Sequence, residues 1–368
     1  ECDPWVTPLH RIVWDRIILD EGHEIRNRRS KTHKAAVTLK GKHRWILSGT
    51  PIYNSMLDFV ALCAFLHIPK QMVQAYPGRI KQRYILRRTK EDVAEHNQRL
   101  ALPKCSFENV ELQMYPEEAT IYESAYNQSR DIINEIFKTA QNISMHNMNI
   151  LECLLRVRQA MIHPQLYLDG IALKDEQELD IFTGKSKKFE TLHSLISEHP
   201  AEKSLIFCQF HSEMNMIQNM IENIDIKTFR IDGSVAKEDR DEQIRAFKAY
   251  QGGAAFIIQI KAGGVGLNLQ EATRVYITAP SWNPATELQA IGRSHRTGQT
   301  KQVFVKKLIY QGTDETPSIE QSIMELQGHK SMVCAEVLGD KRLEHVIPVT
   351  NKNGVTIRDV RKLFSKNP

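Results

Sequence analysis

Short, continuously apolar segments recur along this chain, and each one runs into a polar or glycine-containing turn followed by a helical pattern. The clearest are the runs ending at Leu19 and Phe210, together with Ala254 to Ile260 and Arg274 to Pro280. A short β-branched run of this kind is typical of a strand buried on both faces of a parallel sheet. Strands that alternate with helices predict an α/β fold built on parallel sheets.

Length and composition set the class of protein. The chain has 368 residues, of which 41% are hydrophobic and 25% charged, and its net charge is +5. These values predict a globular protein of about two domains with no membrane span, and they permit a nucleic-acid partner. Since no pair of cysteines has CxxC spacing, we expect neither structural zinc nor a disulfide framework, as in a reducing compartment. The cysteines are Cys2, Cys63, Cys105, Cys153, Cys208 and Cys334.

Two carboxylates follow the first buried run. Asp20 and Glu21 come directly after Leu19, and Gly22 and His23 complete the turn. Ligands of open α/β sheets bind at the carboxyl ends of the strands. One acid can therefore hold magnesium while the other orients an attacking water. A solvated loop after a strand is the alternative for these residues taken alone.

A second run, His43 to Pro51, repeats the pattern of a buried strand that leads into a polar turn. Its turn contains Ser48, Gly49 and Thr50, which we expect to lie beside the acids. A helix is predicted from Asn54 to His67. Further on, Arg87 and Arg88 stand next to acids, where a solvated charged face is an equal alternative.

The stretch from Trp282 to Gln299 carries Arg293 and Arg296, three residues apart. That spacing predicts one shared helix face, with Gln289 one turn earlier. Gly298 stands where a helix end favours a residue that tolerates positive φ. Guanidinium groups suit phosphate recognition, and they neutralise charge in phosphoryl transfer. A solvated basic helix end is the alternative.

A glycine-rich turn, Lys261 to Asn268, follows the strand Ala254 to Ile260 and opens toward a helix. Such a turn lets the backbone approach a phosphate. By contrast, Gly184-Lys185-Ser186 only resembles the end of a phosphate loop, because Leu179 occupies the required glycine position. No other segment supplies a phosphate loop.

The middle of the chain predicts helices. One begins at Pro116 and another runs through Leu151 to His163 and stops at Pro164. The segment from Tyr167 to Gly184 is acidic and irregular, which indicates a surface linker.

The order of the motifs resembles that of the Swi/Snf-type ATPases, the duplex-DNA translocase branch of superfamily-two helicases. The similarity covers nearly the whole chain. Within the family it is greatest for the Lodestar and transcription-termination-factor subgroup and for compact viral members such as the baculovirus global transactivator. The motifs are DEGH (20–23), LSGTPIYN (47–54), LRRTK (86–90), IHPQL (162–166), IFCQF (206–210), RIDGS (230–234), KAGGVGLNL (261–269) and QAIGRSHRTGQ (289–299).

The resemblance implies two RecA-like parallel-sheet lobes with a helical insertion between them. Residues 1–104 would be the remaining part of lobe 1, the ATP-binding domain, incomplete at its N-terminus. Residues 105–184 would be the helical protrusion and linker, 185–345 lobe 2, the helicase C-terminal domain, and 346–368 a tail.

The resemblance also assigns roles to the matching positions. Asp20 would hold magnesium, Glu21 would activate water, and His23 would report the state of the nucleotide site. Arg293 and Arg296 would act as arginine fingers with Gln289 beside them, and Gly264 and Gly266 would lie near the nucleotide. Residues that couple hydrolysis to DNA or contact it would be Ser48, Thr50, Arg87, Arg88, Lys261, Asn268 and Trp282.

Some positions depart from the family pattern. Tyr53 replaces a glutamine, Ala279 an acid before the WNP element, and Leu288 an acid before Gln289; the last two leave the turnover rate open. The family's phosphate loop lies upstream of DEGH, and the chain opens on Glu1 rather than methionine. We therefore expect a fragment that hydrolyses ATP poorly by itself.

The implied function is an ATP- and magnesium-dependent translocase on double-stranded DNA that remodels or displaces DNA-bound protein, in transcription regulation or termination, in the nucleus. A non-catalytic DNA-binding module derived from such an ATPase is the alternative from another class. A strand-separating RNA helicase fits less well, because the chain has DEGH rather than DEAD and a helical middle segment.

Overall fold

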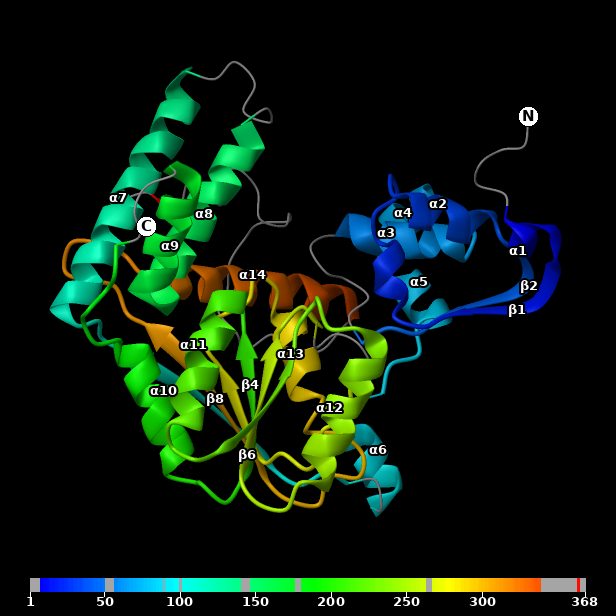
Figure 1. The fold of residues 1–368 in the computed structure, drawn as a ribbon. Coiled ribbons are helices and arrows are strands. Elements are labelled where there is room, and N and C mark those ends of the chain that lie inside the picture. Colours follow the sequence, from blue (N-terminus) through cyan, green and yellow to red (C-terminus); the bar gives the residue numbers. More distant parts are fainter. Residues whose placement is uncertain are drawn as a thin grey trace. The chain divides into compact units, whose positions relative to one another are not determined.

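A computed structural model of the chain describes residues 7–49, 56–88, 90–98, 101–139, 146–175, 180–262, 267–338 and 363–364. The chain divides into two units (Figure 1). The first comprises Glu1–Arg88, Asn283–Ala285 and Leu326–Thr356, and the second comprises Thr89–Trp282, Thr286–Glu325 and Ile357–Pro368.

The first unit contains a two-stranded parallel sheet and short helices. Gly41 lies so close to Ile17 of the neighbouring strand that an added Cβ would come within 2.5 Å of Ile17 Cδ1, which explains a glycine inside a strand. The elements are α1 (Pro8–Arg11), β1 (Val13–Leu19), η1 (Gly22–Ile25), α2 (Lys31–Thr38), β2 (Lys40–Ile46), α3 (Met56–Phe65), α4 (Lys70–Ala75) and α5 (Pro77–Tyr84).

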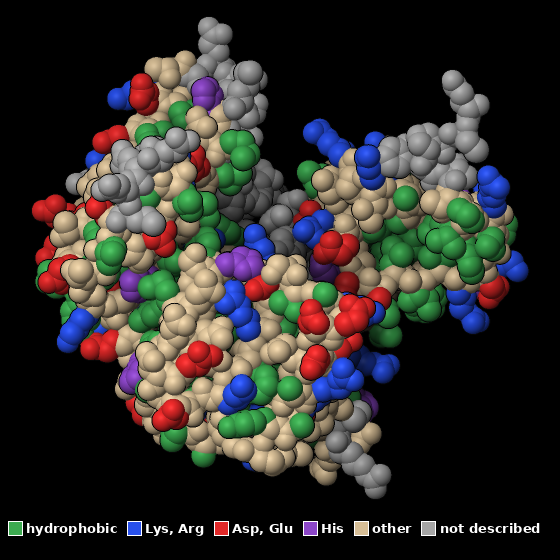
Figure 2. Space-filling model, in the orientation of Figure 1, with side chains coloured by type: hydrophobic (Ala, Val, Ile, Leu, Met, Phe, Trp, Pro, Cys, Tyr) green, Lys and Arg blue, Asp and Glu red, His purple; other side chains and the backbone are tan. Residues whose placement is uncertain are grey.

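One face of this sheet packs on helices, whereas the other face is exposed among the described residues. Ile17 of β1 packs with Leu62 and Phe65 of α3 in a buried cluster. On the opposite face of the sheet, Ile18 of β1 and Trp45 of β2 pair in register, and their side chains are 58% and 57% exposed. Figure 2 shows hydrophobic side chains gathered where Figure 1 draws β1 and β2. The prediction that this apolar run is buried on both faces is therefore wrong, because burial depends on what covers each face, which the run itself does not encode.

The second unit is an α/β layer structure on a six-stranded sheet. All strand pairs in it are parallel, in the order β3-β8-β7-β4-β6-β5. The elements are α6 (Lys90–His96), β3 (Cys105–Leu112), α7 (Pro116–Thr139), α8 (Asn147–Ile162), α9 (Pro164–Asp175), α10 (Lys187–Ser197), β4 (Lys203–Cys208), α11 (His211–Glu222), β5 (Lys227–Ile231), α12 (Lys237–Ala249), β6 (Ala254–Gln259), β7 (Arg274–Ile277), α13 (Pro284–Ile291), β8 (Val303–Tyr310) and α14 (Ile319–Leu338). The first two residues of α13 and the part of α14 from Leu326 onward belong to the first unit.

The continuous apolar runs of this unit form its core, as predicted. β4 and β6 lie side by side and are almost wholly buried, and α11 and α12 lie beside them in Figure 1. Phe229, Phe247 and Phe256 pack edge to face or tilted, with centroids 4.9 to 6.1 Å apart. Each fully buried side chain of this kind contributes about 1.5–3 kcal/mol. The predicted α/β class with parallel sheets is confirmed.

Two boundaries in the middle segment differ from those predicted. Residues 105–112, which were expected in the helical protrusion, form strand β3 and pair with β8. Part of the predicted linker from Tyr167 is helix α9, in which Leu166, Tyr167 and Ala172 are buried. Pro164, interpreted as the end of a helix, also begins the next one, because proline fits the first helical turn.

None of the helices in the described part of the chain combines the length and apolarity required to span a membrane.

Candidate active site

The Asp20–His23 turn connects the carboxyl end of β1 to η1. The backbone ties it to the end of the neighbouring strand, since Leu47 N–H donates to Leu19 O at 2.8 Å and Gly22 N–H donates to Leu47 O at 2.9 Å. An added Cβ at Gly22 would lie 2.4 Å from Ile46 Cγ2, so this close approach requires glycine. The two predicted polar turns therefore lie side by side.

Glu21 adopts an unusual backbone conformation. Its φ of 47° and ψ of 44° are left-handed, and its N–H donates to Asp20 Oδ1 at 3.0 Å. A non-glycine residue pays about 1–2 kcal/mol for this conformation, and such residues concentrate at functional sites. The separate roles predicted for the two carboxylates stay a prediction.

His23 links the acids to the second turn. Its buried ring places Nδ1 3.2 Å from Ser48 Oγ and 3.3 Å from Glu21 Oε2, while Nε2 lies 3.3 Å from Glu24 Oε1. Ser48 is therefore beside the acids, as predicted. Thr50 lies outside the described residues.

Asp20 could contribute to a magnesium site. Among the described residues no three side chains of His, Cys, Asp or Glu gather as a complete metal cage. Magnesium typically takes one or two protein carboxylates and completes its shell with water and substrate phosphates. The exposed Asp20 carboxylate fits that use of a single protein ligand.

In the second unit, the predicted residues lie at the carboxyl ends of β6 and β7. Lys261 is exposed just beyond β6, and Asn268 lies between the buried residues Leu267 and Leu269. Within the described part of the chain, the buried Oδ1 atom of Asn268 has no hydrogen-bond partner. Gly264 and Gly266 lie outside the described residues.

The arginine segment is fastened to the chain that follows the glycine-rich turn. Leu269 N–H donates to Arg293 O at 3.0 Å, and Arg296 Nη1 donates to Leu267 O at 3.4 Å. Ser294 Oγ donates to Ala272 O at 2.6 Å. The structure thus brings the two arginines next to the residues that flank Asn268, more than twenty positions earlier in the sequence.

The two arginines do not share a helix face with Gln289, and that prediction is wrong. Helix α13 ends at Ile291, so only Gln289 is helical, and Arg293 and Arg296 lie in the turns that follow. Hydrogen bonds such as that of Ser294 to the neighbouring loop compete with continued helix. Gly298 has φ of 101°, as expected, although it stands in this turn and not at the helix end.

Trp282 has a partner that the sequence did not reveal. The Arg158 guanidinium of α8 lies 5.3 Å from the Trp282 ring centroid, and its Nη2 donates to Pro280 O at 3.1 Å. Burial lowers the pKa of Arg158, while Glu320 and Glu213 oppose that change. The sequence offers little signal for it, because Arg158 is one of two arginines in a helix of mixed polarity just before the IHPQL motif.

A buried ion pair fixes the start of α13. Glu287 Oε2 accepts from Lys307 Nζ at 2.7 Å, and Glu287 Oε1 accepts from Ser281 N–H at 2.7 Å. Both charged side chains are 5% exposed. The pair was not predicted, and its only signal in the sequence is a lysine within an apolar strand.

Arg87 and Arg88, predicted to contact DNA, are both exposed beyond the end of α5 in the first unit.

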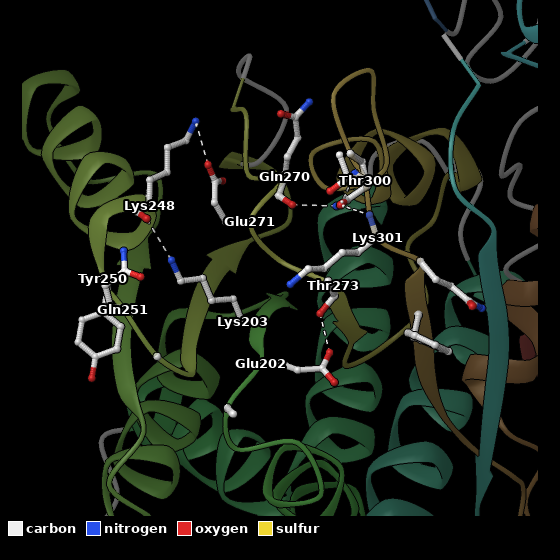
Figure 3. A pocket seen from close by; sticks show the side chains of 15 residues that line it. Glu202, Lys203, Lys248, Tyr250, Gln251, Gln270, Glu271, Thr273, Thr300 and Lys301 are labelled. Carbon is white, nitrogen blue, oxygen red and sulfur yellow. Dashed lines mark hydrogen bonds and ion pairs between the residues drawn. The ribbon is translucent and has the colours of Figure 1, made fainter. Parts of the chain in front are cut away.

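A hollow of about 690 Å³ lies at the opposite, amino-terminal edge of the second sheet (Figure 3). Its acids are neutralised, since Arg274 binds both oxygens of Glu202 at 3.0 Å and Lys248 lies 3.8 Å from Glu271. The hydrogen bonds from Arg274 lower the pKa of Glu202 to about 2. Because ligands of parallel sheets bind at the carboxyl ends, we place the candidate active site at the other edge despite the size of this hollow.

Comparison with known proteins decides the family. Residues 6–76 and 78–166 match the profile of the SNF2-related domain, and residues 187–298 match that of the helicase conserved C-terminal domain. Together the two profiles match well over half of the chain. The chain belongs to the SNF2 family.

Several relatives match along most of the chain. Mouse (Mus musculus) helicase-like transcription factor is 27% identical over 92% of this chain and 45% of its own length. The probable global transactivator of Orgyia pseudotsugata multicapsid polyhedrosis virus is 28% identical over 96% of this chain and 70% of its own. A putative ATP-dependent helicase/translocase of Bacillus subtilis (strain 168), YwqA, is 33% identical over 83% of this chain and 34% of its own.

The chain therefore spans less than half the length of the first of these relatives. Among solved structures, the Sulfolobus solfataricus SWI2/SNF2 ATPase core in complex with double-stranded DNA is 28% identical. The superposition has a TM-score of 0.48 and covers 94% of this chain and 75% of the Sulfolobus chain.

Proposed function

We propose that this protein is an ATP-dependent translocase on double-stranded DNA. The observation that carries the proposal is the His23 ring, which touches both the Glu21 carboxylate and the Ser48 hydroxyl. A residue that contacts the candidate catalytic base and the neighbouring turn can pass the state of one to the other. A module that only bound DNA would have no use for this arrangement or for the strain at Glu21.

The chemistry assigned to these residues is phosphoryl transfer to water. Glu21 would accept a proton from the attacking water, and Asp20 would hold magnesium, which neutralises phosphate charge when bound. Arg293 and Arg296 would offset the charge that develops on the transferring group, and Gln289 of α13 would contribute to the same site. Gly264 and Gly266 would lie next to the nucleotide.

The remaining residues would face DNA. Ser48, Thr50, Arg87, Arg88, Lys261, Asn268 and Trp282 are the proposed coupling and DNA contacts. Contacts to phosphates rather than to base edges would make binding largely independent of sequence. We further propose that the two RecA-like lobes lie within residues 1–104 and 185–345, with strand β3 added to the sheet of the second lobe, and that 346–368 is a tail.

The names of two relatives, a transcription factor and a transactivator, support a role in transcription regulation on DNA-bound protein in the nucleus. We expect the chain by itself to hydrolyse ATP poorly, since it contains no phosphate loop.

The test is ATP hydrolysis by the protein expressed from its complete coding sequence, with and without duplex DNA. We expect duplex to stimulate turnover. Arg296→Ala should reduce turnover at least roughly a thousandfold, as for other arginine fingers, with little change in duplex affinity. Arg245→Ala, in exposed α12, is the matched control and should change neither.

Equal losses of turnover and duplex affinity in Arg296→Ala would make this arginine a DNA anchor. Duplex binding without any ATP turnover in the wild-type protein would favour the non-catalytic module.

A further inference from the structure

The segment from Lys70 to Arg88 of the first unit is basic and contains no acidic residue of its own. It contains Lys70, Arg79, Lys81, Arg83, Arg87 and Arg88 and no aspartate or glutamate. Surface segments of globular proteins ordinarily intersperse both signs, so this one-sided composition indicates a polyanionic partner.

The fold turns most of these cations outward. Val73 of α4 and Ile80 of α5 are 0% and 3% exposed and anchor the two helices in an apolar cluster with Phe59 and Val60. Arg79 and Arg83 are exposed on α5, and Lys81 between them is half-buried. Within the part of the chain that the structure describes, none of these three cations forms an ion pair.

Two tyrosines order the guanidinium groups. Arg79 lies 5.3 Å from the Tyr76 ring centroid and Arg83 lies 5.7 Å from that of Tyr84. Stacking on an aromatic ring limits the motion of an arginine and lowers the entropic cost of binding. Because an arginine already occupies one face of each tyrosine ring, the two tyrosines are less suited to stacking on unpaired bases. This favours a duplex over a single strand.

Lys70 also lies near a cation from outside this segment, Arg28 of the same unit. Arg28 and Lys70 line a hollow of about 240 Å³ whose other walls are mostly apolar, formed by Val60, Ala64, His67, Ile68 and Pro69. Neither cation is paired with an acid among the described residues.

The alternative is that the cations of α5 only stabilise the helix through a favourable interaction with its dipole. Lys81 and Arg83 stand in the last turn of α5, where positive charge is favourable by a few tenths of a kcal/mol. That account explains neither Arg79 in the first turns nor Lys70 and Arg88 outside the helix. Helix α12 shows the ordinary arrangement, since its Lys237, Arg240 and Arg245 alternate with four acids.

We infer that α5 and its flanking residues form an accessory surface that binds the phosphate backbone of duplex DNA. The inference rests on the proposed function for the identity of the polyanion. It adds a contact on α5, with Arg79, Lys81 and Arg83 as its centre. Its expected use is to retain the duplex while the motor residues release and rebind it.

The test is equilibrium binding of the 368-residue chain to short labelled duplexes of two unrelated sequences, without ATP, as salt is raised from about 50 to 200 mM. The test variant combines Arg79→Gln, Lys81→Gln and Arg83→Gln. The matched control combines Lys237→Gln, Arg240→Gln and Arg245→Gln in α12. A charge-retaining variant, Arg79→Lys with Arg83→Lys, checks that the helix tolerates substitution.

We expect the α5 triple variant to bind both duplexes several-fold more weakly, with a salt slope smaller by about one for each DNA phosphate that the variant no longer neutralises. The α12 and charge-retaining variants should bind like the wild type. Should the triple variant fail to fold, single Arg79→Gln should still reduce the slope by about one.

An unchanged slope, or an equal loss of affinity in the α12 control, would overturn the inference, and so would tighter binding of single strands than of duplex. These outcomes are separable from failure of the proposed function. If duplex stimulates ATP hydrolysis but the α5 triple variant binds duplex like the wild type, only the proposed α5 surface is refuted. If duplex binding depends on α5 but the protein does not hydrolyse ATP, only the proposed motor function is refuted.

Discussion

Lys188 of α10 and Glu320 of α14 form a buried ion pair in the second unit, with Lys188 Nζ 2.6 Å from Glu320 Oε1. Their side chains are 1% and 3% exposed. Glu320 Oε2 also accepts from Tyr310 N–H at 2.8 Å, and the Tyr310 hydroxyl donates to Glu118 of α7 at 2.7 Å. The network therefore joins the long helix of the middle segment to the sheet. Burial raises the pKa of Glu320 even though Lys188 opposes that change.

Breaking this pair from one side should cost far more than removing it. Lys188→Met leaves a buried carboxylate uncompensated and should lower the free energy of unfolding by about 3–5 kcal/mol. Lys188→Met combined with Glu320→Gln keeps an acceptor for Tyr310 and should recover most of that loss. Urea unfolding of both single variants and the double variant measures the coupling, and simple additivity would contradict this account.

His163 should make stability depend on pH. Burial lowers its pKa to about 4, an effect that Asp169 only partly offsets, and Gln165 N–H donates to its Nδ1. The unfolded chain binds the proton near pH 6.5, so the stability is complete above that pH and is lost as pH falls toward 4. The loss is roughly 3 kcal/mol, at about 1.4 kcal/mol for each pKa unit.

The measurement is urea unfolding of wild type and His163→Asn between about pH 7 and 4. The difference between the two proteins should shrink as pH falls. A difference that stays constant would mean that His163 is not held neutral by its surroundings.

The two faces of the β1–β2 sheet should respond differently to substitution. Replacing Phe65, fully buried on the covered face, by alanine should lower the free energy of unfolding by about 3–5 kcal/mol. Ile18→Thr and Trp45→Thr, on the exposed face, should stay within about 0.5 kcal/mol of wild type. Urea unfolding of the three variants measures this difference, and large losses at Ile18 and Trp45 would show that this face is covered in solution.

Arg158 should be irreplaceable by lysine. Arg158→Ala removes the hydrogen bond to Pro280 and the contact with Trp282, and should cost about 1–3 kcal/mol. Lysine keeps the charge but not the planar fork, so Arg158→Lys should restore little of the loss. Full recovery of stability in the lysine variant, measured by urea unfolding, would leave the charge alone as the relevant property.

The continuous apolar runs predicted β4 and β6 because strands buried on both faces need no other signal. The neighbourhood of Asp20, Glu21, His23 and Ser48 was also predictable, since parallel strands end at one edge. The buried pair Glu287–Lys307 was not, because each residue alone resembles an ordinary surface charge. The non-helical conformation of Arg293 and Arg296 was not predictable either. The helix ends because of hydrogen bonds to residues distant in the sequence, such as the bond from Ser294 to Ala272.

The most direct test of the motor account is the rate of duplex-stimulated ATP hydrolysis by Glu21→Gln in the protein expressed from its complete coding sequence. Glutamine preserves the size of the side chain but cannot take a proton from water, so turnover should fall at least roughly a hundredfold. Duplex binding should persist. An unchanged rate would contradict the assignment of Glu21 as the catalytic base and, with it, the proposed site.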